Sequence, residues 1–198
     1  MIKKYDPYSK YASTTDVSLG DSIVEDWNCE LVEPSNPALH RSATTDPFKG
    51  DIDWNIREKE MLEVMHANLG VGLSSTQLGS NYNMFVMTHS FLGDIGVYKP
   101  KILETEGEVL IEEGCLTWPL LYIKIKRASK IRVQFTKTDG ETDVEMWMDG
   151  IDARCFLHEY DHLQGINFID LVSDFKLQMA KEKRDKRFKK LERSVKRG

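Results

Sequence analysis

Apolar residues recur at helical spacing in an otherwise polar segment between Asp53 and Gly70. They are Ile56, Met61, Leu62, Met65 and Leu69, and Gly70 follows where a helix would end. Residues three and four apart lie on one face of a helix. The spacing therefore predicts an amphipathic helix with its apolar side against a core.

Further along the chain the pattern changes to the alternation that is typical of strands. The segments are a short apolar run at 84–87 and alternating runs at 122–126, 131–135 and 144–148. Thr138-Asp139-Gly140 supplies turn residues between the last two, so we expect a hairpin of antiparallel strands with one face in water. The glycine-punctuated segment Gly70–Leu73 is expected to run extended past close backbone neighbours.

The last third of the chain predicts two helices. Gly150 and Gly165 bracket an apolar-rich segment, 151–164, and a short strand is expected at 166–169. A basic segment follows and predicts a surface helix with a narrow apolar stripe of Phe188, Leu191 and Val195. The predicted class is α+β, with antiparallel or mixed sheets around a central helix at 151–164 and a basic C-terminal helix.

The chain length of 198 residues suits one core and is too short for two independent catalytic domains. We divide the chain into an N-terminal extension (1–22), a core domain (23–173) and the basic C-terminal helix (174–198). No apolar run approaches the roughly 20 residues of a membrane-spanning helix. The first residues lack a secretory signal, and three cysteines without CxxC spacing suit a reducing compartment. We expect a cytoplasmic protein with neither a membrane nor DNA as partner.

Charge is distributed unevenly along the chain. The net charge is −5, yet residues 176–198 hold eleven Lys or Arg and three Asp or Glu. Such a segment can bind a polyanion such as RNA, although a basic run is often only the solvated face of a helix.

The sequence His158-Glu159-Tyr160-Asp161-His162 is an HExxH pentad. On a helix, its two histidines share one face and can bind one divalent metal, with a carboxylate beside them to move protons. This pattern favours hydrolysis. The alternative is a helix with two hydrogen-bonded histidines and a solvated glutamate.

A catalytic metal site needs a third protein ligand from outside the pentad. Cys155 is on the same predicted helix, but it lies about 7.5 Å along the axis from the midpoint of the two histidines, too far for a metal–sulfur bond. We interpret Cys155 as packing at the site wall. Cys115, in Glu113-Gly114-Cys115-Leu116-Thr117, would alone be taken for a small buried residue, but beside an HExxH helix it becomes the preferred third ligand.

Three segments together resemble the motifs of peptide deformylases, in the order of that family. They are Gly70-Val71-Gly72-Leu73-Ser74-Ser75-Thr76-Gln77, Glu113-Gly114-Cys115-Leu116-Thr117 and His158-Glu159-Tyr160-Asp161-His162-Leu163-Gln164-Gly165. The likeness covers about residues 53–170. Ser74-Ser75 replaces the usual alanines, Thr117 the usual Ser, and Leu157 the usual Gln. We expect Leu157 and the charged Arg154 to alter the pocket wall.

The resemblance implies a role for each residue of the predicted site. Cys115, His158 and His162 would bind one divalent ion, natively Fe²⁺, with Zn²⁺, Ni²⁺ or Co²⁺ as substitutes. Glu159 would transfer the proton, while the Gln77 amide and the Leu116 backbone N–H would stabilise the oxyanion. The peptide would pair as a strand with Val71, Gly72 and Gly114. Val71, Ile151, Cys155 and the His158 ring would line a methionine pocket with Tyr122 and Arg154 near its rim, and Asp161 would meet Arg127.

The implied function is removal of the formyl group from the N-terminal formylmethionine of nascent polypeptides, with release of formate. Residues 23–173 would then form the catalytic domain, and the basic helix could dock on the ribosome. One alternative is an ordinary HExxH zinc peptidase, although no histidine follows His162, and Glu182 and Glu192 fall in the basic segment. Another is a ribosome- or RNA-binding protein on a degenerate deformylase scaffold.

Overall fold

A computed structural model describes residues 29–195, so the predicted N-terminal extension lies outside the described residues. Five antiparallel strands form the main sheet in the order β1-β2-β3-β6-β7. Their bounds are Gly72–Ser74, Met84–His89, Gly93–Glu106, Lys130–Thr136 and Asp143–Asp149. Strands β4 (Val109–Cys115) and β5 (Trp118–Arg127) form a separate two-stranded antiparallel sheet, called here the ribbon.

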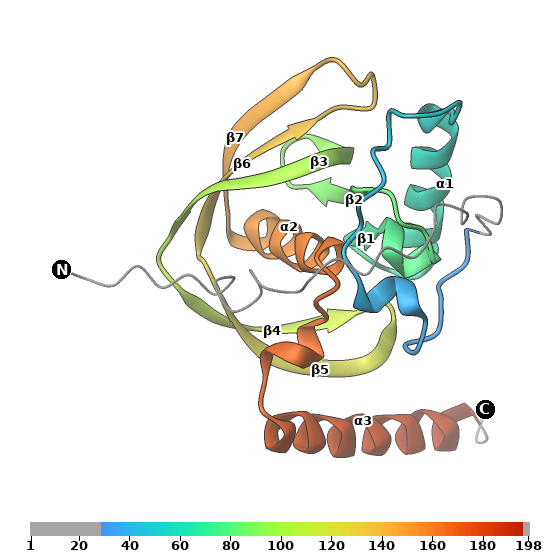
Figure 1. Ribbon diagram of the computed structural model, residues 1–198. Helices are drawn as coiled ribbons and strands as arrows, with labels where there is room; N and C mark the ends of the chain where they lie inside the picture. The colour runs from blue at the N-terminus through green and yellow to red at the C-terminus, as the bar shows by residue number, and fades with distance from the viewer. Residues whose placement is uncertain (1–28, 196–198) are drawn as a thin grey trace.

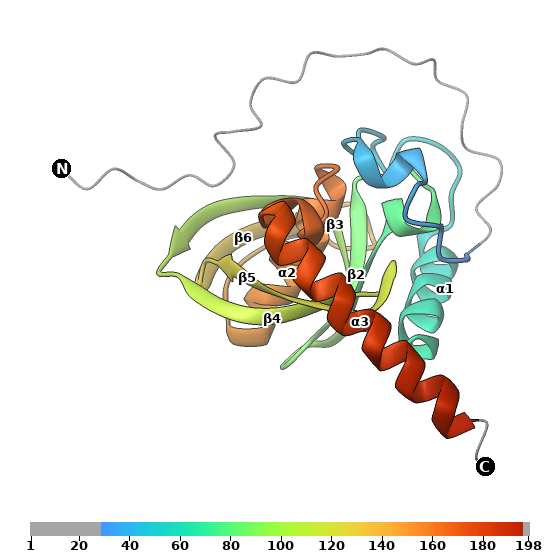
Figure 2. The same cartoon turned by 90° about the horizontal axis from the view of Figure 1, so that it is seen from below.

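Within residues 29–195, three α-helices accompany the sheets: α1 (Trp54–Ala67), α2 (Gly150–Leu163) and α3 (Asp174–Val195). Short 3₁₀ helices are η2 (Pro37–His40), η3 (Ser75–Leu78) and η4 (Phe168–Leu171). Figure 1 shows α2 between the main sheet and the ribbon, with α3 on the other side of the ribbon. Seen from below, α3 crosses the ribbon and extends past it (Figure 2). The class is therefore α+β, as predicted.

The buried apolar residues in the described part of the chain form three clusters. The main core joins one face of α2 to the sheet, through residues such as Phe85, Val133 and Phe156. A second cluster packs Met61 and Met65 of α1 against β1, β2 and β3. A third, the ribbon core, consists of Trp118, Leu121, Ile123, Ile125, Phe168 and Ala180, with partly buried neighbours. Burying one such large side chain contributes roughly 1.5–3 kcal/mol, so each cluster holds its layer in place.

The helix predicted from Asp53 is α1, which begins as expected because the Asp53 side chain accepts a hydrogen bond from the Asn55 N–H. Its apolar face is narrower than predicted. Met61 and Met65 are fully buried, but Ile56 is 56 % and Leu69 93 % exposed. Leu69 lies beyond the helix with φ at 58°, in the turn that leads to β1.

The predicted strand at 166–169 is wrong, because the segment turns into η4. Asn167 and Asp170 form a capping box, in which the Asn167 N–H donates to the Asp170 carboxylate at 2.9 Å. The Ile166 N–H donates back to the Asp161 carbonyl. These local bonds outcompete extended structure, and they direct Phe168 into the ribbon core.

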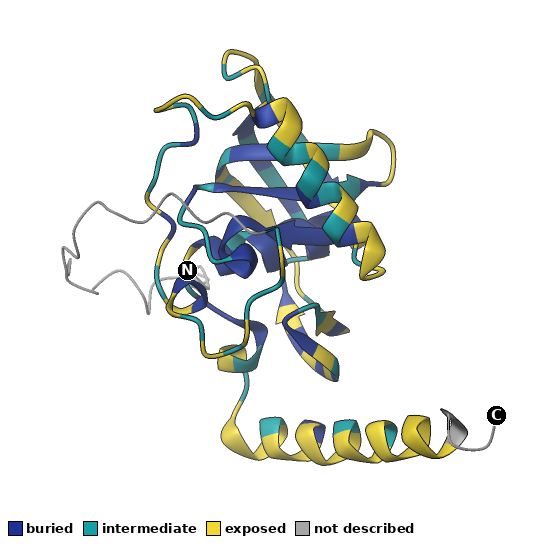
Figure 3. Ribbon diagram, turned by 90° about the vertical axis from the view of Figure 1, so that its right-hand side faces the viewer, coloured by how far each residue is buried: buried dark blue, intermediate teal, exposed yellow. Residues whose placement is uncertain are grey.

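The predicted surface helix is α3, but residues other than those of the predicted stripe make its contact with the ribbon, and the side chain of Val195 lies outside the described residues. Helix α3 meets β5 through Leu177 and Ala180, while Phe188 and Leu191 are 40 % and 50 % exposed. Figure 3 shows α3 exposed along most of its length and α2 buried. Within the described residues, no helix combines the length and apolar character that crossing a bilayer requires.

Gly165 follows the C-cap of α2 with φ at 72°, and a Cβ there would lie 2.7 Å from backbone atoms of Arg41. Gly93 has nearly the same φ, 75°, but open space around it. We predict that Gly93→Ala lowers the free energy of unfolding by about 1–2 kcal/mol, the cost of the left-handed backbone. Gly165→Ala should cost about 1–3 kcal/mol more, since the Arg41 backbone must move. Urea unfolding of both variants tests this, and equal losses would contradict it.

Candidate functional site

The HExxH pentad lies on the second half of α2, which begins after Asp149 and ends at Leu163. His158 and His162 are one turn apart, with ring centroids 5.0 Å from each other and an interplanar angle of 79°. Both are buried, His158 at 8 % and His162 at 1 % exposure. The helical spacing thus places two imidazoles together, as the sequence predicted.

Cys115 comes from a different element, the end of β4. The ladder between β4 and β5 shifts register between Glu113 and Cys115, where β5 has three more residues than β4 between the pairs Glu113–Ile123 and Cys115–Trp118. A bulge of this kind bends a strand and redirects the next side chain. The Cys115 Sγ lies 3.2 Å from the His162 Nε2, and the ligand atoms of Cys115, His158 and His162 all lie within 4.8 Å of one another.

The chemistry of these three side chains fits a divalent metal. A thiolate and two imidazoles are ligands for Zn²⁺ and Fe²⁺. Burial lowers the pKa of His162 well below its usual value, so its ring is neutral and its lone pair is available. For His158, burial also opposes the charge, but hydrogen bonds to Cys115 and Glu113 outweigh it and raise the pKa to about 10. The cluster therefore attracts positive charge, which a bound cation would supply.

Glu159 lies beside the cluster in a buried, poorly solvated position. Burial raises the pKa of its carboxyl to about 7, despite the opposing charges of His158 and Arg127. Its Oε2 atom has no hydrogen-bond partner among the described residues. A carboxyl that titrates near neutrality can both accept and release a proton. Gly72 is the neighbour that makes room for it, because a Cβ at Gly72 would lie 2.5 Å from the Glu159 Oε1.

Gln77, in η3, points its amide at the cluster. Its Oε1 accepts a hydrogen bond from the Ser74 N–H at 2.9 Å, which orients the side chain. Its Nε2 donates to the Thr117 hydroxyl at 3.1 Å and to the Cys115 Sγ at 3.4 Å. Leu116 follows Cys115 in the turn between β4 and β5. Gln77 thus contacts the Cys115 sulfur, and Leu116 is the residue next to Cys115 in the chain.

The predicted peptide-binding residues lie on two strand edges. β1, with Gly72, is the edge strand of the main sheet, and β4, with Gly114, is an outer strand of the ribbon. Val71, which precedes β1, is 51 % exposed, and Ile151 is 62 % exposed in the first turn of α2. Cys155 follows Ile151 by one turn, and its thiol donates to the Val71 carbonyl at 3.2 Å. Burial raises the pKa of this thiol, which keeps it protonated.

Glu113 belongs to the second deformylase-like segment, but the sequence indicated no role for it. In the structure its carboxylate contacts His158, Arg127 and Arg154. Its Oε2 meets the His158 Nδ1 at 3.1 Å, while Arg127 donates to both of its oxygens and Arg154 donates to Oε1 at 2.6 Å. Burial would raise the pKa of Glu113, but His158 and Arg127 hold it far below its usual value. A carboxylate on the outer nitrogen of a ligand histidine fixes the ring for metal binding.

The sequence also predicted the places of Asp161, Arg154, Leu157 and Tyr122, and the structure agrees with only part of these predictions. Arg127 also binds the Asp161 carboxylate, the ion pair predicted from the sequence. Arg154, however, does not lie at an open rim: it is 5 % exposed, because it turns inward to Glu113 and to backbone carbonyls. Leu157 also points away from the cluster, into the main core. Tyr122 is 42 % exposed and packs under the Arg187 guanidinium.

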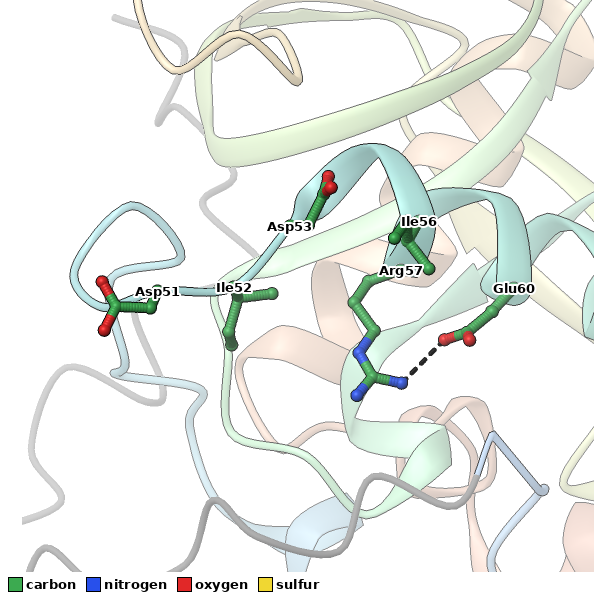
Figure 4. A pocket seen from close by; sticks show the side chains of 6 residues that line it. All are labelled: Asp51, Ile52, Asp53, Ile56, Arg57 and Glu60. Carbon is green, nitrogen blue, oxygen red and sulfur yellow. Dashed lines mark hydrogen bonds and ion pairs between the residues drawn. The ribbon is translucent and has the colours of Figure 1, made fainter.

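A hollow elsewhere on the surface lies at the start of α1 (Figure 4). Its lining residues are Asp51, Ile52, Asp53, Ile56, Arg57 and Glu60. Arg57 and Glu60 form an ion pair across it at 2.7 Å. None of the predicted site residues lines this hollow, so it is separate from the cluster on α2.

Comparison with known proteins agrees with the motifs. The model of the polypeptide deformylase family matches residues 29–178. A peptide deformylase of Thermotoga petrophila is 38 % identical over 150 residues, which are 75 % of this chain and 89 % of that protein. A peptide deformylase of Chromobacterium violaceum is 38 % identical over 132 residues, 66 % of this chain and 78 % of that protein.

Solved structures show the same fold. The crystal structure of a peptide deformylase from Legionella pneumophila has a TM-score of 0.72 at 31 % identity and covers 82 % of this chain and 96 % of that one. The peptide deformylase from Thermus thermophilus has a TM-score of 0.70 at 33 % identity, covering 77 % and 90 %. The chain therefore belongs to the peptide deformylase family, whose members remove the N-formyl group from nascent polypeptides.

Proposed function

We propose that Cys115, His158 and His162 carry the catalytic divalent ion of this deformylase and that Glu159 moves the proton. The observation that supports this most directly is the convergence of one thiol and two imidazoles from separate elements within 4.8 Å. The family is metal-dependent, and three protein ligands leave a position open, as in catalytic sites generally. A bound ion supplies Lewis acidity that makes water nucleophilic near neutral pH.

In the reaction, water attacks the formyl carbon and the carbon–nitrogen bond breaks, giving formate and a free amino terminus. Glu159 takes a proton from the attacking water and passes it to the leaving nitrogen, a role that suits its pKa of about 7. The Gln77 amide and the Leu116 N–H donate to the oxygen that becomes negative. Donors fixed in advance are effective because they need no reorganisation as charge develops.

We propose Fe²⁺ as the native ion, with Zn²⁺, Ni²⁺ or Co²⁺ as substitutes. The mixed set of one soft sulfur and two imidazole nitrogens supports any of these metals. It does not favour Mg²⁺ or Ca²⁺, which prefer oxygen ligands.

We propose that the formylmethionine peptide binds as an added strand between β1 and β4, using backbone groups of Val71, Gly72 and Gly114. Both strands have an edge with no neighbouring strand among the described residues, which supports this mode. The methionine side chain would lie against Val71, Ile151, Cys155 and the His158 ring. The central HExxH helix and the catalytic unit of residues 23–173 belong to the same proposal. So does action in the cytoplasm, since three cysteines without CxxC spacing suit a reducing compartment.

We further propose that α3 docks the enzyme on the ribosome. Its lysines Lys181, Lys183, Lys186, Lys189 and Lys190 are all exposed. One side of α3 packs on the ribbon, where Arg187 donates to the Leu120 carbonyl at 3.0 Å and Ala180 is buried. The opposite, basic side is therefore presented to solvent, where ribosomal RNA could bind it.

We predict that Glu159→Gln lowers formate release from a formyl-Met peptide by about 10²–10⁴-fold, since it removes the group that accepts and returns the proton. Metal content should stay unchanged, because Glu159 is not proposed as a ligand. Glu63→Gln on α1, whose side chain is 67 % exposed, is the matched control and should keep full activity. Turnover by Glu159→Gln near that of the control would refute the role of Glu159, and hydrolysis of unformylated peptides by the wild type would favour a peptidase.

We predict that reversing three charges on α3, with Lys186→Glu, Lys189→Glu and Lys190→Glu, abolishes cosedimentation with ribosomes at low salt. Each lysine that binds a phosphate releases a counterion, so binding should also fall steeply as salt is raised. Formate release from a short peptide should not change, because these residues lie outside the site.

The control for this experiment reverses three exposed lysines elsewhere: Lys59, Lys101 and Lys124. It produces the same change in net charge and should still cosediment. If both triple variants bind ribosomes as the wild type does, α3 is not a docking element.

A further inference from the structure

The ribbon that supplies Cys115 has little apolar packing against α2, which supplies the histidines. The apolar side chains of the ribbon pack against η4 and α3. The apolar side chains of α2 pack against the main sheet, in a core that contains no β4 or β5 residue among those described. Apolar packing thus holds each element in place separately, and the distance between them depends on other contacts. Two ring contacts join the ribbon core to α2, Trp118 with His162 and Phe168 with His158.

The other contacts are polar and centre on two buried arginines. Arg127, at the end of β5, reaches from the ribbon to α2, where it donates to the Asp161 carboxylate and to the Leu157 carbonyl. Arg154 reaches the other way, from α2 to the ribbon. Both donate to Glu113, which in turn faces His158. The Glu113 carboxylate therefore accepts hydrogen bonds from one arginine of the ribbon and from one arginine of α2.

Arg154 makes three hydrogen bonds to the ribbon. Its Nη1 donates to the Glu113 Oε1 at 2.6 Å and to the Ile125 carbonyl at 3.1 Å, and its Nη2 donates to the Val109 carbonyl at 3.0 Å. Val109 and Ile125 belong to β4 and β5, so one guanidinium ties both strands to α2. Its planar fork of donors suits such a set of fixed acceptors, and a flexible ammonium group does not.

The position of Arg154 relates it to both kinds of metal ligand. It lies one helical turn before His158 on α2, and its partner Glu113 lies two residues before Cys115 on β4. Arg127 also binds both oxygens of Glu113, but it divides its charge between Glu113 and Asp161, so both arginines compensate Glu113. What Arg154 adds is the pair of bonds to the strand carbonyls, which fix the ribbon relative to the helix.

We infer that Arg154 is a positioning residue that docks the ribbon on α2 and thereby holds the Cys115 sulfur at its bonding position beside His158 and His162. This inference rests on the proposed function, in which these three side chains bind the ion. Arg154 touches neither metal nor substrate in this role. It acts through Glu113 and through the backbone of β4 and β5.

The test uses Co²⁺ as a probe in the full-length protein, because a cobalt–thiolate bond gives a charge-transfer absorption that reports the Cys115 ligand. We expect Arg154→Met, which keeps an unbranched side chain but has no donors, to bind Co²⁺ about 10–100-fold more weakly in competition with a chelator. Its charge-transfer band should weaken or shift at saturating Co²⁺. Hydrogen exchange of the Val109–Cys115 amides should be faster in the metal-free variant.

The matched control is Arg132→Met on β6, where the arginine pairs with Glu104 and Glu145 at the surface. It should leave Co²⁺ affinity, the absorption band and ribbon exchange unchanged. Arg154→Lys keeps the charge near Glu113 but lacks the fork, so it should show the same losses to a smaller degree. It is the deciding variant if Arg154→Met does not fold.

A Co²⁺ affinity and spectrum equal to the wild type in Arg154→Met would overturn the inference, even if that variant were less stable. The same result in Arg154→Lys would overturn it if only that variant folds. Failure of the proposed function would instead appear in the wild type, as Co²⁺ bound without a thiolate band. The two failures are therefore distinguishable in one series of measurements.

Discussion

The site depends on the buried ion pairs of Glu113, because its ligands come from two elements that share little apolar surface. The carboxylate faces His158 and receives hydrogen bonds from Arg127 and Arg154. Buried charges are costly unless their partners are well placed, and removing one partner leaves another charge uncompensated. Arrangements that separate these groups are therefore costly. In the observed arrangement the ring of His158 is fixed, and β4 brings Cys115 to the helix.

The proposed catalytic groups are buried ionisable side chains that lower the stability of the folded protein, and the apolar core offsets this cost. The Glu159 carboxyl is buried, has an Oε2 without a hydrogen-bond partner among the described residues, and has a pKa raised to about 7. His162 is buried with its pKa lowered. Such groups reduce stability when considered alone, and they are retained where chemistry needs them. The apolar face of α2, packed on the main sheet through Phe156 and Leu157, supplies the opposing stabilisation.

The sequence alone predicted the regular elements with clear periodicity and the ligands within known motifs. It missed β3, since Gly93–Glu106 mixes buried and exposed residues without alternation and contains Pro100 and two register shifts. It predicted the pairing of Arg127 with Asp161 only through the family resemblance. It placed Arg154 at a rim, although the side chain turns inward to Glu113, 41 residues away in sequence. Local patterns contain no information on such distant partners, so the tertiary fold decides them.

The central claim is that one thiolate and two imidazoles bind a single ion in this deformylase. X-ray absorption spectroscopy of the zinc- or iron-loaded protein tests it most directly, because sulfur and nitrogen scatterers are distinguishable. For zinc, the account predicts one sulfur at about 2.3 Å and two imidazole nitrogens at about 2.0–2.1 Å, with oxygen completing the shell. Cys115→Ser should lose the sulfur contribution. A wild-type spectrum with only nitrogen and oxygen around the metal would contradict the account.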